Sequence, residues 1–560
     1  MIPQPPSPSR EAFLNRTNVH NKSSLSDRKR VFQSDSDLTN HARKRVRLEG
    51  NHEVNTPVIE NIDGYSSSED DSDVVAIPRP SWTRSIYSMH SALLSSSPST
   101  LSRLQYPSTR PILESFVSSH KADMFKCHSV DINSFTSIPY ACSYSNNAKR
   151  GGSPLLSVAT EQGVVYILDT RKREDWDCEP QRISFQPFAN GIFDVHWSPD
   201  DTLLATASAD RTVHISSLES TGVKTIRQLH GHKGTVKCVS WDPSRNGDIL
   251  CSGGRDGGIC VWDLRVGKDI QSPEDVERGS CSPVIVIPRA HDSKEQLTKS
   301  RPRKGKLPPA TLRSITSLVF SPTEPLGLIS SGSTDGILRY WDLRLPILTG
   351  DSTRSKKAAK TKISPLITST DPTTYQNTRR SRGISSLSLG SGPSAYSLFA
   401  LANDSRVHTF NQRTLEPLSG WTFSKAKDQA QETILDNWSY GHDEMRTNSF
   451  YVRAATSPCG SWLASGGAEK GSVFLFDISG GAESRFRSTG DDMGDDGTRR
   501  AVQLRGQTGE VGAVDWAQGM LASCADDGTV RIWRPDIEVY RRCQENAESM
   551  RWDWSWSTNA

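Results

Sequence analysis

The stretch GGRDGGICVWDLR (Gly253–Arg265) indicates the fold of this chain. A tight turn around Asp256 leads into a short alternating strand, and the strand closes on Trp-Asp-Leu-Arg. A near copy, GSTDGILRYWDLR, spans Gly332–Arg344. Recurrence of one short unit is typical of architectures built from repeated strands or helices. We therefore expect further copies of this unit along the chain.

The unit recurs between about residue 112 and residue 540. In each copy a turn residue stands six positions before the residue that ends the alternating strand. The seven pairs are Gln162/Leu168, Asp210/Ser216, Asp256/Trp262, Asp335/Trp341, Asp404/Phe410, Lys470/Phe476 and Asp527/Trp533. A hydroxyl often stands four positions before the turn, as at Thr206, Ser252, Ser331 and Ser523.

These features resemble the WD repeat (WD40), whose units are four-stranded blades arranged around a channel. The resemblance implies an all-β, seven-bladed WD40 β-propeller over residues 111–540. It also implies a buried hydrogen-bonded tetrad of His, Ser or Thr, Asp and Trp in each complete repeat. This structural tetrad falls on His232, Ser252, Asp256 and Trp262, and in part on Ser331, Asp335, Trp341, Ser523, Asp527 and Trp533. We interpret these residues as part of the scaffold, not as a catalytic His-Ser-Asp set.

The segments outside the repeats differ in composition. Residues 1–110 are rich in Ser, Pro and charge, and so few apolar residues predict a disordered N-terminal extension. Residues 541–560 are expected to be a C-terminal tail. Because seven blades need only about 40–45 residues each, the excess within residues 111–540 predicts long loop insertions. We place them at about 268–310, 345–383, 412–446 and 479–500.

Basic residues gather in three of these segments. Two clusters within residues 28–47 resemble a bipartite nuclear-import signal, which implies an import receptor and a nuclear location: Lys29, Arg30, Arg43, Lys44, Arg45 and Arg47. Two insertions are also basic, through Lys299, Arg301, Arg303, Lys304 and Lys306, and through Lys356, Lys357, Lys360 and Lys362. We expect them to raise the positive potential on one side of the disc, which favours an anionic partner. Solvated basic segments without a partner are the alternative in both cases.

The chain lacks the motifs of several other protein classes. It has no Gly-rich phosphate loop, no paired-His metal motif and no nucleophile elbow. We therefore expect no catalysis, no cofactor, no metal and no small-molecule substrate.

The N-terminus lacks the apolar core of a signal peptide, and the ten cysteines include no C-x-x-C pair. These features predict a soluble intracellular protein of a reducing compartment, with no membrane contact.

The arginine that ends the two WDLR stretches has two interpretations. Arg265 is expected where the innermost part of the blade passes into a connecting loop, and an exposed pair with Asp263 would contribute little. The other repeats end in DTR, FNQ, FDIS and IWRP, so we infer that the blade does not require the arginine. Arg344 repeats it in the next blade, which would place two guanidinium groups on one rim. Such groups are suited to bidentate capture of carboxylates and carbonyls at an interface.

The double ending resembles the DWD box of WD-repeat proteins. The box implies docking on the damaged-DNA-binding (DDB-type) adaptor of cullin-4 RING ubiquitin ligases. On this chain the adaptor contacts would be Arg265 and Arg344, oriented by Asp263 and Asp342. Longer stretches, including DILCSGGRDGGICVWDLR, AHDSKEQ, NSFYVRAATSP and LASCADDGTVRIW, are similar to the denticleless (Cdt-type) family.

The denticleless resemblance implies a non-catalytic substrate receptor. In that family, replication and cell-cycle regulators bound to the sliding clamp on DNA are ubiquitinated for proteasomal degradation, in S phase and after DNA damage. Substrate contacts are expected on the face with the basic insertions, with Arg255 and the residues from Lys299 to Lys306 as candidates. No clamp-binding motif is present, and we expect no long C-terminal tail of the metazoan type. The alternatives are a chromatin or transcription scaffold unattached to a ligase, and a direct nucleic-acid-binding protein.

Overall fold

The computed structural model describes eleven stretches of the chain, and everything below concerns these residues. They are residues 109–130, 135–174, 182–219, 222–266, 280–292, 313–344, 363–374, 380–418, 439–449, 451–479 and 499–557. The nuclear-import residues within 28–47 lie outside them, as do the basic residues of 299–306 and 356–362. Of residues 1–110, for which disorder was expected, residues 1–108 also lie outside the described stretches, and Arg110 begins the helix α3 (Arg110–Glu114).

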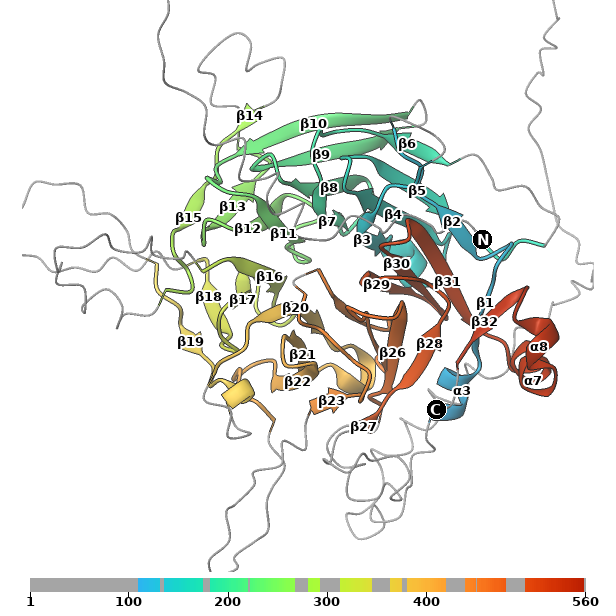
Figure 1. The fold of residues 1–560 in the computed structure, drawn as a ribbon. Helices are drawn as coiled ribbons and strands as arrows, with labels where there is room; N and C mark the ends of the chain where they lie inside the picture. The colour runs from blue at the N-terminus through green and yellow to red at the C-terminus, as the bar shows by residue number, and fades with distance from the viewer. Residues whose placement is uncertain are drawn as a thin grey trace, which may run out of the picture. The chain divides into compact units, whose positions relative to one another are not determined.

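Seven sheets are arranged in a ring, so the predicted seven-bladed β-propeller is confirmed (Figure 1). Blade 1 contains β3 (Pro139–Tyr144), β4 (Leu155–Thr160), β5 (Val165–Asp169) and β6 (Ile183–Phe185); blade 2 contains β7 (Ile192–Trp197), β8 (Leu203–Ser208), β9 (Thr212–Glu219) and β10 (Gly222–His230). Blade 3 contains β11 (Val236–Trp241), β12 (Ile249–Gly254), β13 (Ile259–Asp263) and β15 (Ile285–Ile287); blade 4 contains β16 (Ile315–Phe320), β17 (Gly327–Gly332), β18 (Arg339–Asp342) and β19 (Ile367–Thr368).

The remaining three blades follow the same order. Blade 5 contains β20 (Ile384–Leu389), β21 (Ser397–Ala402), β22 (Arg406–Asn411) and β23 (Ser439–Gly441); blade 6 contains β24 (Ala454–Thr456), β25 (Trp462–Ser465), β26 (Ser472–Asp477) and β28 (Val502–Arg505). Blade 7 contains β29 (Val511–Ala517), β30 (Met520–Ala525) and β31 (Thr529–Pro535). Two short strands, β14 (Ser280–Cys281) and β27 (Arg499–Arg500), add parallel edges to blades 2 and 5.

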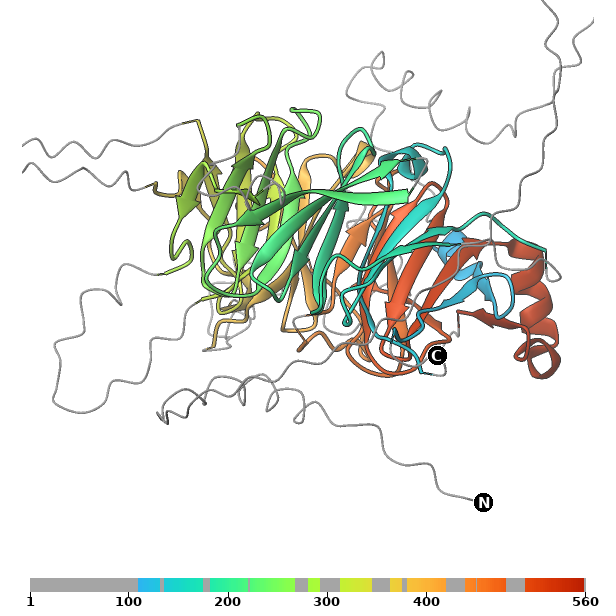
Figure 2. The same cartoon turned by 90° about the horizontal axis from the view of Figure 1, so that it is seen from above.

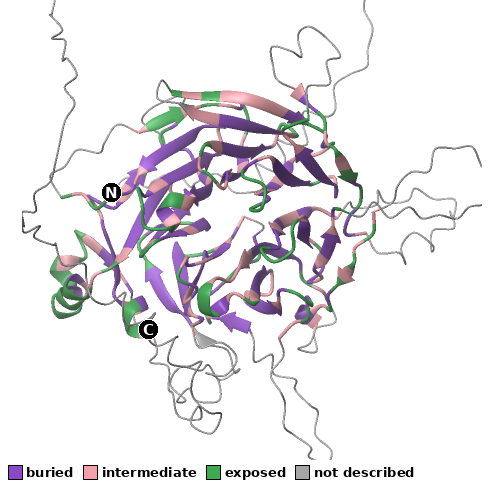
Figure 3. Cartoon of the chain, turned by 180° about the vertical axis from the view of Figure 1, so that it is seen from behind, coloured by how far each residue is buried: buried purple, intermediate pink, exposed green. Residues whose placement is uncertain are grey.

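The hydrophobic core lies between neighbouring blades, where the strand faces are buried (Figure 3). Trp262 of blade 3, for example, packs with Trp241 of its own blade and with Ile215 of blade 2. Each strand-end residue of the sequence repeat lies in the third strand of its blade, from Leu168 in β5 to Trp533 in β31. The repeat is therefore defined by one turn and one buried strand.

In the described part of the chain, no helix has the length and hydropathy needed to cross a membrane.

The two faces of the disc carry different connections, because the four strands of a blade are antiparallel. We call one side the Asp256 face; there each first strand begins and the turn between second and third strands lies. We call the other the Arg265 face, where each third strand ends. Figure 2 views the blades from the side. The two basic insertions were expected on one side, but their described flanks lie on opposite faces. β15 ends and β16 begins at the Asp256 face, whereas β18 ends at the Arg265 face.

The predicted insertions and tail contain regular structure. The outer strands β15, β19 and β23 fall within the first three insertion ranges, and β27 falls within the fourth. They are too short to carry the alternating pattern by which a strand is recognised in sequence. The predicted C-terminal tail includes the end of α7 (Ile537–Glu545), then α8 (Ala547–Met550) and β32 (Trp554–Trp556).

Blade 7 is completed by the N-terminal part of the propeller. The strands β1 (Phe116–Ser119) and β2 (Met124–Lys126) both pair antiparallel with β31, and β32 pairs with β1. The carboxylate of Asp123, between β1 and β2, forms a buried ion pair with Arg534 of β31. Arg534 also donates to the carbonyl of Thr170 in blade 1. The ring is therefore closed by segments from both ends of the propeller.

Candidate docking sites on the propeller

The predicted tetrad of blade 3 is assembled in the structure. His232 Nδ1 lies 3.2 Å from Asp256 Oδ1, and His232 Nε2 lies 2.8 Å from Ser252 Oγ. The indole Nε1–H of Trp262 donates to the same hydroxyl over 2.8 Å. Burial alone would raise the pKa of Asp256, but the hydrogen bond from His232 and two backbone amides lower it. Ser252 is fully buried under Trp262, so these residues act as a structural link between strands.

Blade 4 corrects one residue of the predicted tetrad. The hydroxyl that accepts from Trp341 Nε1 (2.9 Å) and contacts His291 Nε2 (2.9 Å) belongs to Ser330, not to Ser331. The turn between β17 and β18 has one residue more than its blade 3 counterpart, since Ser330 pairs with Arg339 where Ser252 pairs with Cys260. Counting back from Asp335 therefore selects the wrong hydroxyl. Because side chains alternate along a strand, Ser331 faces the other way.

The longer turn of blade 4 also changes the acidic end of the tetrad. His291 Nδ1 lies 4.0 Å from Asp335 Oδ1, and Arg313 Nη1 donates to Asp335 Oδ2 over 2.7 Å. His291 itself was missed in sequence, although the quoted stretch AHDSKEQ contains it. In blade 7, Gln507 occupies the histidine position and accepts a 2.6 Å hydrogen bond from Ser523 Oγ. Each of the three tryptophans thus donates to a buried hydroxyl.

The two serines of blade 4 provide a direct test of this register. Ser330→Ala is expected to lower the free energy of unfolding by about 1–3 kcal/mol, because it leaves the buried Trp341 Nε1–H without its acceptor. Ser331→Ala is expected to cost less, since the Ser331 hydroxyl contacts Thr316 Oγ1 at 3.0 Å and donates to the Ser317 carbonyl at 3.5 Å, and Thr316 keeps its own bond to the Ile384 carbonyl. Urea unfolding of both variants measures the difference. Equal losses, or a larger loss for Ser331→Ala, would contradict the assigned register.

Arg265 and Arg344 adopt the same geometry on neighbouring blades. Arg265 donates through Nε to Asp263 Oδ1 (3.0 Å) and through Nη2 to Asp263 Oδ2 (2.7 Å). Arg344 makes the same two bonds to Asp342, at 3.0 and 2.9 Å. The hydrogen bonds from each arginine lower the pKa of its aspartate. In each arginine, Nη1 and Nη2 carry further N–H groups besides the one that bonds to the aspartate. The Arg265 side chain is 55% exposed and the Arg344 side chain 49%.

Both arginines lie in the outer half of their blades. We expected Arg265 beside the innermost strand, but it follows β13, the third strand, and only β15 lies farther out. The innermost strand is β11. The position on a face of the disc was predicted from the repeat, whereas the distance from the channel depends on the order of strands within the sheet.

The same arginine position is occupied in two further blades. In blade 1, Arg171 N–H donates to Asp169 Oδ1 over 3.1 Å and Arg171 Nε lies 3.1 Å from Asp169 Oδ2. In blade 5, Arg413 N–H donates to Asn411 Oδ1 over 2.9 Å. The inference that the other repeats vary at this position is therefore wrong for the endings DTR and FNQ. What separates blades 3 and 4 is the complete Trp-Asp-x-Arg ending on two adjacent blades.

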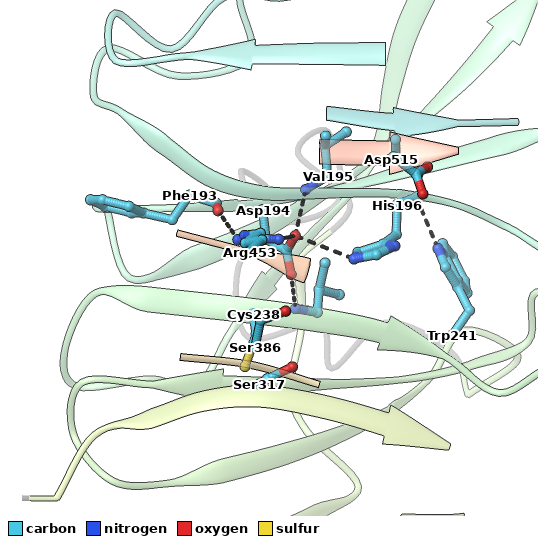
Figure 4. A network of polar contacts seen from close by, with 12 residues as sticks. Phe193, Asp194, Val195, His196, Cys238, Trp241, Ser317, Ser386, Arg453 and Asp515 are labelled. Carbon is cyan, nitrogen blue, oxygen red and sulfur yellow. Dashed lines mark hydrogen bonds and ion pairs between the residues drawn. The ribbon is translucent and has the colours of Figure 1, made fainter. Parts of the chain in front are cut away.

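A polar network that the repeat did not predict joins the innermost strands of several blades (Figure 4). Asp194 of β7 is buried, and its carboxylate pairs with Arg453, which precedes β24 in blade 6. The same carboxylate accepts the Val239 N–H of blade 3 over 2.8 Å and lies 3.2 Å from His196 Nε2. Burial alone would raise the pKa of Asp194, but Arg453 and His196 hold it well below its ordinary value. A charged residue inside the apolar strand IFDVHW was the available sequence signal.

Comparisons with known proteins agree with the fold and extend it. The family model "WD domain, G-beta repeat" matches residues 181–215, 223–263, 307–342 and 499–534. Denticleless protein homolog B of Xenopus laevis is 29% identical over 432 residues, which are 74% of this chain and 50% of that protein. The chain is a WD-repeat protein homologous to the denticleless proteins. The denticleless homolog of Homo sapiens is 26% identical over 408 residues, 71% of this chain and 46% of its own length.

A fungal relative is covered more fully. The cell division cycle protein cdt2 of Schizosaccharomyces pombe is 29% identical over 416 residues, which are 71% of this chain and 69% of that protein. The chain spans about half the length of the denticleless proteins of Xenopus laevis that it matches. The homology covers 71–74% of this chain, and propellers of the denticleless family are typically non-catalytic scaffolds.

Proposed function

We propose that this chain is a substrate receptor of a cullin-4 RING ubiquitin ligase and docks on the ligase's DDB-type adaptor. The supporting observation is the paired Asp-x-Arg geometry of Arg265 and Arg344 on adjacent blades of a denticleless homologue. Substrates would be replication and cell-cycle regulators, bound in part on the sliding clamp, and presented for ubiquitination and proteasomal degradation. The work would take place in the nucleus, with import directed by the basic residues of 28–47.

The proposed docking uses the part of each guanidinium that its own aspartate leaves available. Asp263 and Asp342 hold the Nε edge, so the Nη1–Nη2 edge is oriented before the adaptor arrives. A guanidinium with a fixed direction loses less side-chain entropy when it binds carbonyl or carboxylate oxygens. Docking on the Arg265 face would leave the Asp256 face available for substrate. The propeller would then serve as a rigid spacer, and the transfer chemistry would belong to the other subunits.

The double variant Arg265→Ala/Arg344→Ala tests this docking. We expect it to abolish co-purification of the adaptor while the melting temperature stays unchanged, because both side chains project from the surface. Arg171→Ala is the matched control, since it removes an arginine of the same local geometry from blade 1. Affinity purification followed by immunoblotting for the adaptor gives the readout. Full adaptor binding by a folded double variant would contradict the proposal.

A further inference from the structure

Three cations gather on blade 3 at the Asp256 face, and we call them the blade 3 cation cluster: Lys233, Lys237 and Arg255. Lys233 and Arg255 are exposed, and Lys237 is partly buried in the innermost strand β11. The Arg255 N–H donates to the Thr235 carbonyl over 2.8 Å, which holds the two loops together. Lys237 occupies a register shift between Val236 and Cys238 in the innermost strand.

The neighbouring carboxylates are already engaged. Asp256 accepts from His232, from the Lys233 N–H at 2.7 Å and from the Gly258 N–H at 3.0 Å. Asp194 is paired with Arg453. Within the described residues, no carboxylate lies within ion-pair distance of the Lys233 ammonium or the Arg255 guanidinium. The cluster is therefore a local excess of positive charge on a face that the proposed adaptor docking leaves available.

Three aromatic side chains lie beside Lys237, and we call them the aromatic wall: Tyr140, Phe193 and Tyr451. Tyr140 stacks on Phe193 with ring centroids 5.5 Å apart, and on Tyr451 at 5.1 Å. The Lys237 ammonium lies 3.5 Å from the Phe193 ring centroid and 5.4 Å from that of Tyr451. Burial, followed by repulsion from Arg255 and Arg453, lowers the pKa of Lys237 to about 7. A carboxylate placed beside this ammonium would offset both costs.

We propose that the blade 3 cation cluster binds an acidic peptide segment, whose carboxylates meet Lys233 and Arg255 and reach Lys237 in the innermost strand. Calling this segment part of a ubiquitination substrate rests on the proposed function, but the binding itself does not. The cluster lies on a single blade and reaches its innermost strand. This arrangement suits a short peptide segment better than a contact that covers a whole face of the disc. Charge complementarity of this kind mainly increases association rate and selectivity.

The aromatic wall favours a peptide over a nucleic acid. Single-stranded nucleic acids bind through free aromatic faces on which bases stack. Here the rings of Tyr140, Phe193 and Tyr451 all contact one another, with centroids 5.1–6.0 Å apart, and Lys237 lies over Phe193, so much of their faces is already used. Duplex binding depends on many separated phosphate contacts, which gives a steep dependence on salt. A cluster of three cations on one blade provides few of them.

Fluorescence anisotropy with the full chain tests the proposal. The probe is a labelled short peptide that alternates Glu and Ser, and its Gln-Ser counterpart is the uncharged comparison. We expect Lys233→Glu/Arg255→Glu to raise the Kd for the acidic peptide by about tenfold or more. Lys224→Glu is the matched control, since Lys224 is exposed on the outer strand β10 and the charge change is the same per site. We expect its Kd to equal that of the wild type.

A pH series provides a readout that a purely structural role would not move. The groups around the Lys237 ammonium are Arg255 of the β12–β13 turn, Arg453 before β24, Cys238 of its own strand and the rings of Phe193 and Tyr451. As the pH rises through about 7, Lys237 loses its charge, so affinity for the acidic peptide should fall. Lys237→Met should bind more weakly and lose this part of the pH dependence.

The outcomes separate this proposal from the adaptor docking. Equal Kd values for the acidic and Gln-Ser peptides, or an unchanged Kd in the double variant, would overturn it. Tighter binding of duplex DNA than of the acidic peptide, abolished by the same double variant, would assign the cluster to nucleic acid instead. Co-purification of the adaptor is measured in parallel. Lys233→Glu/Arg255→Glu should retain the adaptor, whereas Arg265→Ala/Arg344→Ala should lose the adaptor and retain the acidic peptide.

Discussion

Replacing Arg453 with Ala is expected to lower the free energy of unfolding by about 3–5 kcal/mol, because it leaves the buried Asp194 carboxylate without its main partner. Asp194 lies in blade 2 and Arg453 precedes the first strand of blade 6, so this ion pair (Figure 4) links blades that are not neighbours in the ring. Urea unfolding monitored by tryptophan fluorescence measures the loss. The surface pair of Arg505 in β28 and Glu444, which lies between β23 and β24, is the control, and Arg505→Ala should cost at most about 1 kcal/mol.

Acidification provides a second signature of this pair. In the folded wild type the pKa of Asp194 lies below its unfolded value of about 3.9, so its stabilising contribution is present above that value. The contribution is lost as the pH falls through the lower folded pKa. In Arg453→Ala, burial without the guanidinium should raise the pKa, so the variant should recover part of its deficit as the pH approaches 4. A deficit that stays constant between pH 7 and pH 4 would contradict the assignment.

Arg534→Ala is expected to open the closure of blade 7. The variant leaves the carboxylate of Asp123 buried and unpaired, and it also removes the donor to the Thr170 carbonyl of blade 1. The free energy of unfolding is expected to fall by about 3–5 kcal/mol, because one partner of a buried ion pair is removed and the other stays buried. Limited proteolysis should then cleave near residues 116–126 well before it cuts the other blades.

The control for this second variant lies on the same segment. Lys121 pairs with Asp553 at 3.5 Å, and both side chains are exposed. Lys121→Ala should therefore leave the cleavage pattern and the unfolding midpoint as they are in the wild type. Cleavage of Arg534→Ala that begins equally in all blades would show that the ion pair does not hold the closing strands.

The repeat predicted the third strands because it records a local geometry. A turn residue and a buried strand end lie six positions apart in every blade, so Asp256 and Trp262 could be placed without knowing their neighbours. The outer strands β19 and β23 were not predicted, since two or three residues carry no periodicity. Ser331 was chosen over Ser330 because a constant spacing cannot show that one turn is longer by a residue.

Long-range pairs escaped prediction for a different reason. Asp194 and Arg453 are 259 positions apart, and only the closed ring brings them together. The pairing of β1 and β2 with β31 likewise depends on circular closure, which no local pattern records. The arginine at the end of the third strand was visible in all four blades that carry it. Only Arg265 and Arg344 were recognised, because Trp-Asp precedes them, while Arg171 and Arg413 follow altered endings.

The pairing of β2 with β31 has a consequence for synthesis of the chain. Asp123 and Arg534 are 411 positions apart, so at 5–20 residues per second a ribosome needs roughly 20–80 s between them. Throughout that interval β1 and β2 lack β31, the strand with which they pair. Unpaired strands of this kind are prone to aggregate, and pairing between distant segments is slow. The first strands of the propeller to be translated therefore complete their sheet last, and a chaperone that shields residues 116–126 should raise the yield of folded protein.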